Sequence, residues 1–315
     1  ADALTELVAA LLNFGHLDRA ERYALMLEKL RPNNPGVRIV LRDLFLLGGK
    51  LDRALGEVVR AIQLGSNTAA SYVVLGNIYA RRRLREQAEE AYRKVLALDP
   101  DSAVVHLGLG NYHRSAKAFK KADAAYNKAR KLDPENFLVL WSLGELRLME
   151  GKRNEALKAF RLSLEARPGF VPSQERIARI LYVQGKRGEA AKIVRDLSAV
   201  DPNNPDVNFL RARIRLDQGK IREALVDLQR VLTVRPRYPR ARFHVGMAHM
   251  RLGRLDLATR SFEKSVESQP MFVPARVRLA EAYMRQNRPR EAIQQFATIM
   301  EMEPKNTPVK LRLAA

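Results

Sequence analysis

Apolar and polar residues follow one another along this chain with the spacing of amphipathic helices, and the pattern recurs at a fixed interval. Within each stretch of 34 residues, counted from Ala1, apolar side chains recur three and four residues apart over positions 3 to 14 and again over positions 17 to 30. This spacing places them on one face of a helix. The pattern therefore predicts two helices in every stretch and an all-α fold.

Four positions of the 34-residue unit carry nearly constant residues. Position 8 is Gly or Ala in seven of the nine units, with Val8 and Arg42 as exceptions, and position 24 is aromatic in five. Small residues at positions 8 and 20 allow two helices to approach closely, and a bulky residue at position 24 fills the space beside them. Glycine at position 15, present in six units, permits the left-handed conformation that ends a helix. Position 20 is alanine in every unit: Ala20, Ala54, Ala88, Ala122, Ala156, Ala190, Ala224, Ala258 and Ala292.

Proline marks the junction between units. It cannot continue a helix and restricts the residue before it, so we expect each second helix to end there. Ser66 takes its place in the second unit. The prolines at position 32 are Pro32, Pro100, Pro134, Pro168, Pro202, Pro236, Pro270 and Pro304.

Taken together, these positions resemble the tetratricopeptide repeat (TPR), a 34-residue helix-turn-helix unit. The resemblance implies a right-handed α-α superhelical solenoid, and the style of the repeats is similar to that of bacterial proteins. Residues 307–315 match the start of a tenth repeat and end in an apolar set without a polar cap. We expect the parent protein to continue beyond it, or this end to pack against another molecule, including a second copy end to end. The predicted repeats are 1–34, 35–68, 69–102, 103–136, 137–170, 171–204, 205–238, 239–272 and 273–306, which together form an array over 1–306.

No residue pattern in the chain argues for an enzyme, a cofactor or a metal. The 315 residues include no cysteine, which excludes disulfides, thiolate zinc sites and cysteine nucleophiles. No two of the five histidines stand four residues apart on a helix. The Gly-Leu-Gly at 108–110 lies inside a predicted helix rather than after a strand, which rules out a dinucleotide fingerprint. No signal or membrane-spanning segment stands out, so the compartment, cytoplasmic or bacterial periplasmic, stays open.

Function is expected on the surface of the first helices. The resemblance implies that positions 2, 5, 9, 12 and 13 line a concave groove. Aromatic residues, Met and Arg are enriched at protein interfaces, and Trp141 with Met149 is the preferred anchor. The candidate partner-binding residues are Asn77, Arg81, Asn111, Arg114, Trp141, Glu145, Met149, Arg179, Tyr182, Phe209, Arg213, Phe243, Met247, Arg251 and Arg285.

Charge narrows the choice of partner. Lys and Arg number 56 against 35 Asp and Glu, and the net charge rises from +2 over residues 1–102 to +11 over residues 205–315. The groove positions hold seven basic and seven acidic residues, so we expect the excess on the outer face and the loops. This argues against a specific nucleic-acid partner. The Lys and Asn clamp with which some TPR proteins grip a C-terminal carboxylate is not reproduced, since Val73 and Leu107 stand at position 5.

The sequence thus favours a non-enzymatic scaffold that holds a peptide or protein partner in the concave groove. One alternative is an anionic polymer or a membrane surface bound by the basic outer face. Another is a TPR module of a larger bacterial protein for envelope assembly or exopolysaccharide export, an analogy at the level of fold alone.

Overall fold

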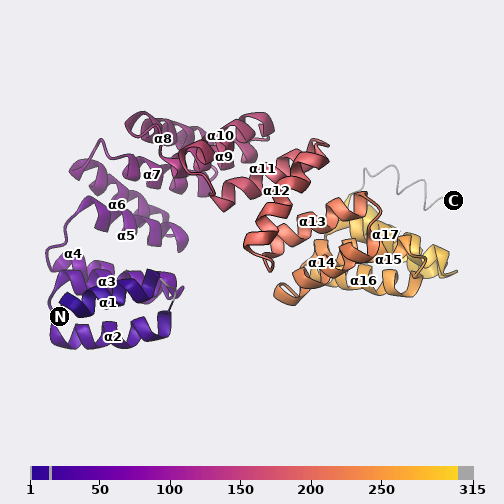
Figure 1. Ribbon diagram of the computed structural model, residues 1–315, viewed down its shortest axis with the longest axis horizontal. Coiled ribbons are helices and arrows are strands. Elements are labelled where there is room, and N and C mark those ends of the chain that lie inside the picture. The colour runs from indigo at the N-terminus through magenta and orange to yellow at the C-terminus, as the bar shows by residue number, and fades with distance from the viewer. Residues whose placement is uncertain (1, 14–15, 304–315) are drawn as a thin grey trace. The chain divides into compact units, whose positions relative to one another are not determined.

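The computed structural model describes residues 2–13 and 16–303, and over these residues the chain forms eighteen α-helices and no strand (Figure 1). The all-α prediction is confirmed, and eighteen helices agree with about nine repeats. The helices are α1 (Asp2–Asn13), α2 (Leu17–Leu30), α3 (Pro35–Leu47), α4 (Leu51–Gln63), α5 (Ala69–Arg81), α6 (Arg85–Leu98), α7 (Ala103–Ser115), α8 (Phe119–Leu132), α9 (Phe137–Met149), α10 (Arg153–Ala166), α11 (Val171–Val183), α12 (Arg187–Val200), α13 (Pro205–Asp217), α14 (Ile221–Val234), α15 (Pro239–Arg251), α16 (Leu255–Ser268), α17 (Val273–Arg285) and α18 (Pro289–Met302).

The chain divides into two compact units. Unit 1 spans Ala1–Pro168 with helices α1 to α10, and unit 2 spans Gly169–Ala315 with helices α11 to α18. Within each unit every odd-numbered helix packs against the even-numbered helix that follows it, and each such pair packs against the next pair. The repeat boundaries given above stay predictions, and the expected tenth repeat at 307–315 lies outside the described residues.

From α3 onward the first helix of each pair begins at position 1, two residues before the apolar pattern predicts. The residue at position 34 of the preceding 34-residue repeat caps several of these helices. Asn34 Oδ1 accepts hydrogen bonds from the backbone N–H groups of Gly36 and Val37, at 2.8 and 3.2 Å. Asn136 and Asn204 cap α9 and α13 in the same way. These caps satisfy backbone donors that the first turn leaves unpaired, so an asparagine before the apolar run was a usable start signal.

The turn between the two helices of a pair has one conformation throughout the described repeats. Position 15 has a positive φ wherever it is described, and this includes three residues other than glycine: Arg83 (φ 62°), Lys117 (φ 58°) and Asn287 (φ 56°). The next residue donates its N–H to the carbonyl five residues earlier, as from Lys50 to Phe45 at 2.8 Å. This is the bond pattern of a Schellman motif. The turn therefore dictates the conformation even where the residue disfavours it.

The alanines of position 20 are the most completely buried positions of the array, since all nine are 0% exposed. Position 8 packs beside them against position 24 of the same repeat. A Cβ built on Gly144 or Gly246 would lie 2.5 Å from the ring of Phe160 or Phe262. Where position 8 is Ala212, position 24 is the smaller Leu228. The two positions thus pack directly against each other, as in a close-packed interior.

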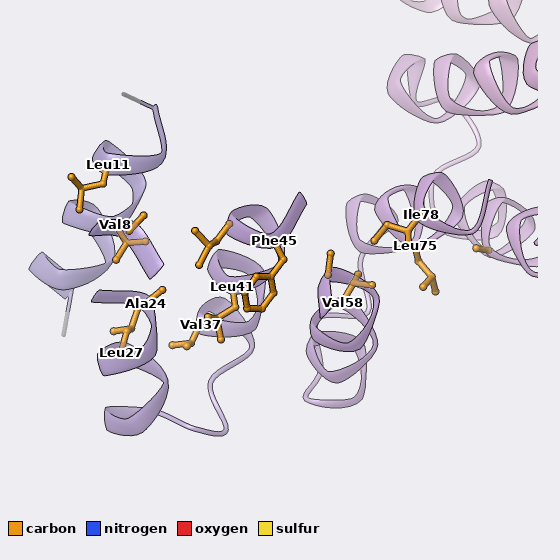
Figure 2. Packing of buried hydrophobic residues seen from close by; sticks show 14 residues of the cluster. Val8, Leu11, Ala24, Leu27, Val37, Leu41, Phe45, Val58, Leu75 and Ile78 are labelled. Atoms are coloured by element: carbon orange, nitrogen blue, oxygen red, sulfur yellow. The ribbon is translucent and has the colours of Figure 1, made fainter. Parts of the chain in front are cut away.

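The buried side chains form a series of clusters between neighbouring helix pairs. Figure 2 shows the cluster at the start of unit 1, where Val8 and Leu11 of α1 face Ala24 and Leu27 of α2. The same cluster continues through α3 and α4 to Ile78 of α5. Each repeat therefore completes its core with side chains of the next one, as expected of a repeat array.

A hydrogen bond that the sequence did not reveal connects consecutive repeats at five junctions of the described chain. The residue at position 4 donates a hydrogen bond to the carbonyl of the proline at position 32 before it, over 2.5 to 3.0 Å. This contact satisfies a backbone carbonyl in the turn just after the second helix. Arginine, histidine and asparagine all act as the donor, so no single residue type at position 4 indicated this hydrogen bond in the sequence. The pairs are Arg38 with Pro32, His106 with Pro100, Asn208 with Pro202, Arg242 with Pro236 and Arg276 with Pro270.

One buried carboxylate explains the arginine that interrupts the apolar series at position 7. Asp227 of α14 has a side-chain exposure of 0% and pairs with Arg211 and Arg215 of α13, each at 2.7 Å. A buried charge without a partner would be costly. Arg211 thus occupies an apolar position because Asp227 faces it.

Candidate functional site

Several first helices contact the first helix of the next pair within each unit. In unit 1, α1 contacts α3, α5 contacts α7 and α7 contacts α9, and in unit 2, α11 contacts α13 and α13 contacts α15. Among the described residues, successive second helices make no contacts of comparable extent. We call the residues at positions 2, 5, 9, 12 and 13 of the odd-numbered helices the first-helix face of each unit.

In unit 1 the centre of this face is apolar and its charges are paired. Trp141 of α9 is half-buried, and the guanidinium of Arg114 lies 6.0 Å from its ring centroid. Arg114 also lies 4.0 Å from the carboxylate of Glu145. Beside them Met149 is 47% exposed and Leu138 is 41% exposed. An aromatic ring and exposed apolar side chains thus stand together around one neutral ion pair.

Asn77 and Asn111 are engaged inside the repeats. Asn77 Oδ1 accepts a hydrogen bond from the hydroxyl of Tyr92 at 2.6 Å, and Asn111 Oδ1 accepts one from Tyr126 at 2.8 Å. Burial raises the pKa of both tyrosines, so the hydroxyls stay protonated and act as donors. These asparagines hold the position 24 tyrosines in place. Their side-chain oxygens are therefore less available to accept hydrogen bonds from a partner. Arg81, at the end of α5, is exposed.

In unit 2 a polar cluster joins α11 to α13. The hydroxyl of Tyr182 donates to Asp217 Oδ2 at 2.9 Å, and Arg187 donates to the same oxygen at 2.7 Å. Although burial alone would raise the pKa of Asp217, the hydrogen bonds from Arg187 and Tyr182 hold it below its usual value. The guanidinium of Arg213 lies 4.4 Å from the Tyr182 ring centroid, within the range of a cation–π contact. Sequence reasoning missed Arg187, because it begins a second helix.

Aromatic rings continue the face from α13 to α17. Phe209 packs edge-on against Tyr238 at 5.2 Å and His244 at 5.4 Å between ring centroids. Phe243 in turn contacts His244 at 5.2 Å and Phe272 at 5.5 Å. Phe209 is only 7% exposed, so it supports the face from below rather than meeting a partner directly. Phe243 and Met247 are half-buried.

The carboxylates of the unit 2 face are all engaged by the protein itself. Asp206 lies 3.3 Å from Arg179 and 2.8 Å from Arg235. Glu281 lies 2.6 Å from Arg278. Glu175 accepts a hydrogen bond from Asn204 at 2.9 Å, and its burial raises its pKa.

Several arginines of this face, by contrast, have no carboxylate partner among residues 2–13 and 16–303. Arg213 contacts aromatic rings, Arg251 donates only to the carbonyl of Leu216 at 2.6 Å, and Arg240 and Arg285 are exposed without a hydrogen bond. The balance of seven basic and seven acidic groove residues therefore does not describe what unit 2 presents to a partner. Asp217, Asp206 and Glu281 pair with Arg187, Arg235 and Arg278, which lie outside the counted positions, and Glu175 is held by Asn204.

Within the described residues no group of three or more His, Asp or Glu side chains is placed to hold a metal ion. None of the described helices has the length and apolar character needed to cross a bilayer.

Models of the tetratricopeptide repeat match residues 73–136, 103–169 and 209–271, and a second set matches 147–214 and 253–315. The chain belongs to the tetratricopeptide repeat family. Proteins of this family are typically protein-binding scaffolds and are generally non-catalytic. A bacterial origin stays a prediction. No curated protein sequence shows a match to the chain.

Solved structures share the TPR fold at low sequence identity. The Cut9–Hcn1 hetero-tetramer of the APC/C matches 95% of this chain and 58% of its own, with a TM-score of 0.73 and 14% identity. The chain thus spans little more than half the length of that relative. PilF of Pseudomonas aeruginosa matches 68% of this chain and 97% of its own, with a TM-score of 0.61 and 21% identity. PilW, a type IV pilus biogenesis factor, matches 67% and 98%, with a TM-score of 0.60 and 18% identity.

Proposed function

We propose that the chain is a non-enzymatic scaffold that holds a peptide or a helix of a partner protein on its first-helix faces. The observation that carries this proposal is the group of Trp141, Met149 and Leu138 in unit 1. A half-buried tryptophan flanked by exposed apolar side chains on one helix is the composition typical of an interface hot spot. The family's usual role as a binding scaffold supports the same function.

The neutral character of this group favours an apolar anchor from the partner. Arg114 is already placed against Glu145 and the Trp141 ring, so neither charge of that ion pair calls for a charged ligand. Methionine adapts to side chains of different shape. We therefore expect a partner that inserts a leucine, methionine or aromatic side chain beside Trp141.

A selection from displayed random 12-residue peptides tests this proposal. Peptides that bind the wild-type chain are measured against Trp141→Ala with Met149→Ala, and we expect at least about a tenfold loss of affinity, as for removal of a hot-spot pair. Met26→Ala is the matched control, because Met26 is 53% exposed and Met149 47%, but Met26 lies on a second helix. Equal affinity of the double variant and the control for every selected peptide would contradict the proposal.

A second candidate function uses the outer face. Second helices carry exposed basic side chains that form no ion pair within the described residues, such as Lys158 and Arg161 of α10 and Arg222 and Arg230 of α14. With a net charge of +21, this surface suits an anionic polymer or an anionic lipid surface. Binding to heparin or to phosphatidylserine vesicles should then fall steeply between about 50 and 200 mM salt. A salt-independent signal, or none at 50 mM, would exclude it.

The similarity to PilF and PilW rests on fold alone. A place for this chain in a larger bacterial assembly, whether for pili, envelope or exopolysaccharide export, is therefore proposed by analogy only. Co-purification of the full-length protein with an envelope fraction tests it.

A further inference from the structure

Unit 2 carries a row of arginines that form no ion pair with a carboxylate of the described chain. Arg213 of α13, Arg251 of α15 and Arg285 of α17 lie in the C-terminal halves of three successive first helices. None of them forms an ion pair within the described residues. We call these three residues the cationic row.

Apolar and aromatic side chains lie on the same face as this row. Tyr182 lies beneath the guanidinium of Arg213. Phe243, Met247 and Met250 of α15 pack against the buried cluster that contains Leu279 and Tyr283 of α17, and all three are partly exposed. The face therefore presents apolar surface together with its positive charges.

α13 contacts α15, and α15 and α17 both pack against α16. Helices in direct contact lie about 8 to 10 Å apart, which gives the scale of the spacing between successive first helices. A peptide in the polyproline II conformation rises about 3.1 Å per residue with three residues per turn. Every third residue of such a peptide therefore points to the same side, about 9 Å from the last. A carboxylate at every third residue matches one arginine on each first helix.

We propose that the unit 2 first-helix face binds an extended acidic segment of a partner protein, with Asp or Glu at every third residue and apolar residues between them. This proposal rests on the proposed function, since it assigns the first-helix face of unit 2 to a partner of stated chemistry. The three carboxylates pair with the cationic row, and the intervening side chains contact Tyr182, Phe243 and the methionines. Arginine is suited to this role because its planar fork of donors matches a carboxylate.

A nucleic acid fits the same face less well. Asp206 and Asp217 lie on it and remain negative, because hydrogen bonds from arginines hold their pKa values low against the effect of burial. A phosphate backbone carries a charge at every nucleotide, and it could not avoid these carboxylates. A peptide can place a neutral residue opposite each of them.

The acidic segment is tested with a labelled peptide of four Glu-Leu-Pro triplets, in which proline enforces the extended form. Comparison peptides carry Lys or Gln in place of Glu, or the same composition with the four Glu residues in one block. We expect the spaced Glu peptide to bind most tightly. Two charge-assisted contacts are worth at least about tenfold in affinity, so Arg251→Glu with Arg285→Glu should weaken it by that factor or more.

The matched control is Arg230→Glu with Arg260→Glu. It changes the net charge of unit 2 by the same amount, but these two exposed arginines lie on α14 and α16. We expect it to change the affinity less than about threefold, as a long-range effect screened by salt. Arg285→Glu alone, which breaks no contact within the described chain, guards against misfolding of the double variant and should still weaken binding.

The proposal is overturned if the spaced Glu peptide binds no better than the Gln peptide, or if both double variants weaken it equally. It is also overturned if a 12-nucleotide poly(U) or phosphatidylserine vesicles bind in an Arg251- and Arg285-dependent way while the Glu peptide does not. If it fails while selected peptides still lose affinity on Trp141→Ala with Met149→Ala, the proposed scaffold function stands. If neither test shows binding, both fail.

Discussion

The first-helix faces of the two units are similar in formal charge and different in the charge that they expose. In unit 1 the face positions hold two basic and three acidic residues, and in unit 2 five basic and four acidic. In unit 1 Arg114 and Glu145 neutralise each other across two first helices. In unit 2 the carboxylates are engaged largely by residues outside the face. The charge that a partner meets on each face thus depends on which charged side chains form ion pairs, and not on the number of charged residues.

Position 24 accounts for one part of this difference, the arginine at position 9 in two repeats of unit 2. In unit 1 Tyr92 and Tyr126 stand there, and each hydroxyl needs the asparagine at position 9 as an acceptor. In unit 2 position 24 has no hydroxyl, since it is Val, Leu or Phe, so position 9 is free to carry Arg179 or Arg213. A change in the second helix therefore alters the chemistry of the first-helix face.

The largest effect is expected at Asp227. At the same position 23, unit 1 has the buried Glu57, which pairs with Arg38, in its second repeat and alanine in its third, fourth and fifth repeats. Asp227→Ala leaves Arg211 and Arg215 without their buried partner and should lower the free energy of unfolding of unit 2 by about 3 to 5 kcal/mol. The urea midpoint measures it. Adding Arg211→Leu, the apolar type found at position 7 elsewhere, should restore much of the loss. No gain from the second change would contradict the paired-charge account.

Acid should weaken unit 2 through His244. Burial between Phe209 and Phe243 lowers the pKa of His244 to about 4, and Arg213, Arg251 and Arg240 add to the shift against the opposing effect of Asp217. The unfolded chain then binds a proton that the folded chain refuses as the pH falls from about 6.5 to 4, so stability decreases over that window, by up to about 3 kcal/mol.

Hydrogen exchange of the α13 and α15 amides from pH 6.5 to 4 measures this acid effect, after correction for the intrinsic pH dependence of exchange. His244→Phe should abolish the part of the stability loss that is specific to unit 2. An unchanged loss in that variant would assign the effect to other groups.

A smaller and equal effect is expected at the shared alanines. Ala156 in unit 1 and Ala224 in unit 2 are both 0% exposed. Ala156→Leu and Ala224→Leu should each cost about 1 to 3 kcal/mol by overpacking, read from the urea midpoint of each variant. Unequal costs would show that the two units do not share the same close-packed frame.

The smallest expected effect is an increase in stability from substitutions in the turns between the paired helices. Arg83 and Lys117 in unit 1 adopt a positive φ, which glycine accepts without strain. Arg83→Gly and Lys117→Gly should each raise stability by about 0.5 to 1 kcal/mol. Asn287→Gly in unit 2 should gain less, because asparagine tolerates this conformation. Thermal midpoints of the three variants check the order, and a loss at Arg83 would contradict it.

The sequence predicted the frame of the fold because its rules act locally. Ala20 and its equivalents, the position 15 turn and the helix pairs all depend on residues within one 34-residue unit. The candidate site depends on contacts between neighbouring 34-residue repeats, such as Tyr182 with Asp217 or Arg251 with the carbonyl of Leu216. The sequence period places a residue on a helix face but does not reveal which neighbouring side chain forms an ion pair or hydrogen bond with it. For this reason the sequence named Asn77 and Asn111 without revealing the tyrosines that they hold. It likewise named Arg213, Arg251 and Arg285 without revealing that they lack a carboxylate partner in the described chain.

The most direct test compares two methionine methyl groups of similar exposure. Met149 of unit 1 is 47% exposed and Met284 of unit 2, beside Arg285, is 55% exposed. With the methyl groups isotope-labelled, NMR relaxation by an anionic and by a cationic nitroxide reports the local potential at each. The account predicts a higher ratio of anionic to cationic relaxation at Met284 than at Met149, and a loss of that excess in Arg285→Glu. Equal ratios at the two methionines would contradict it.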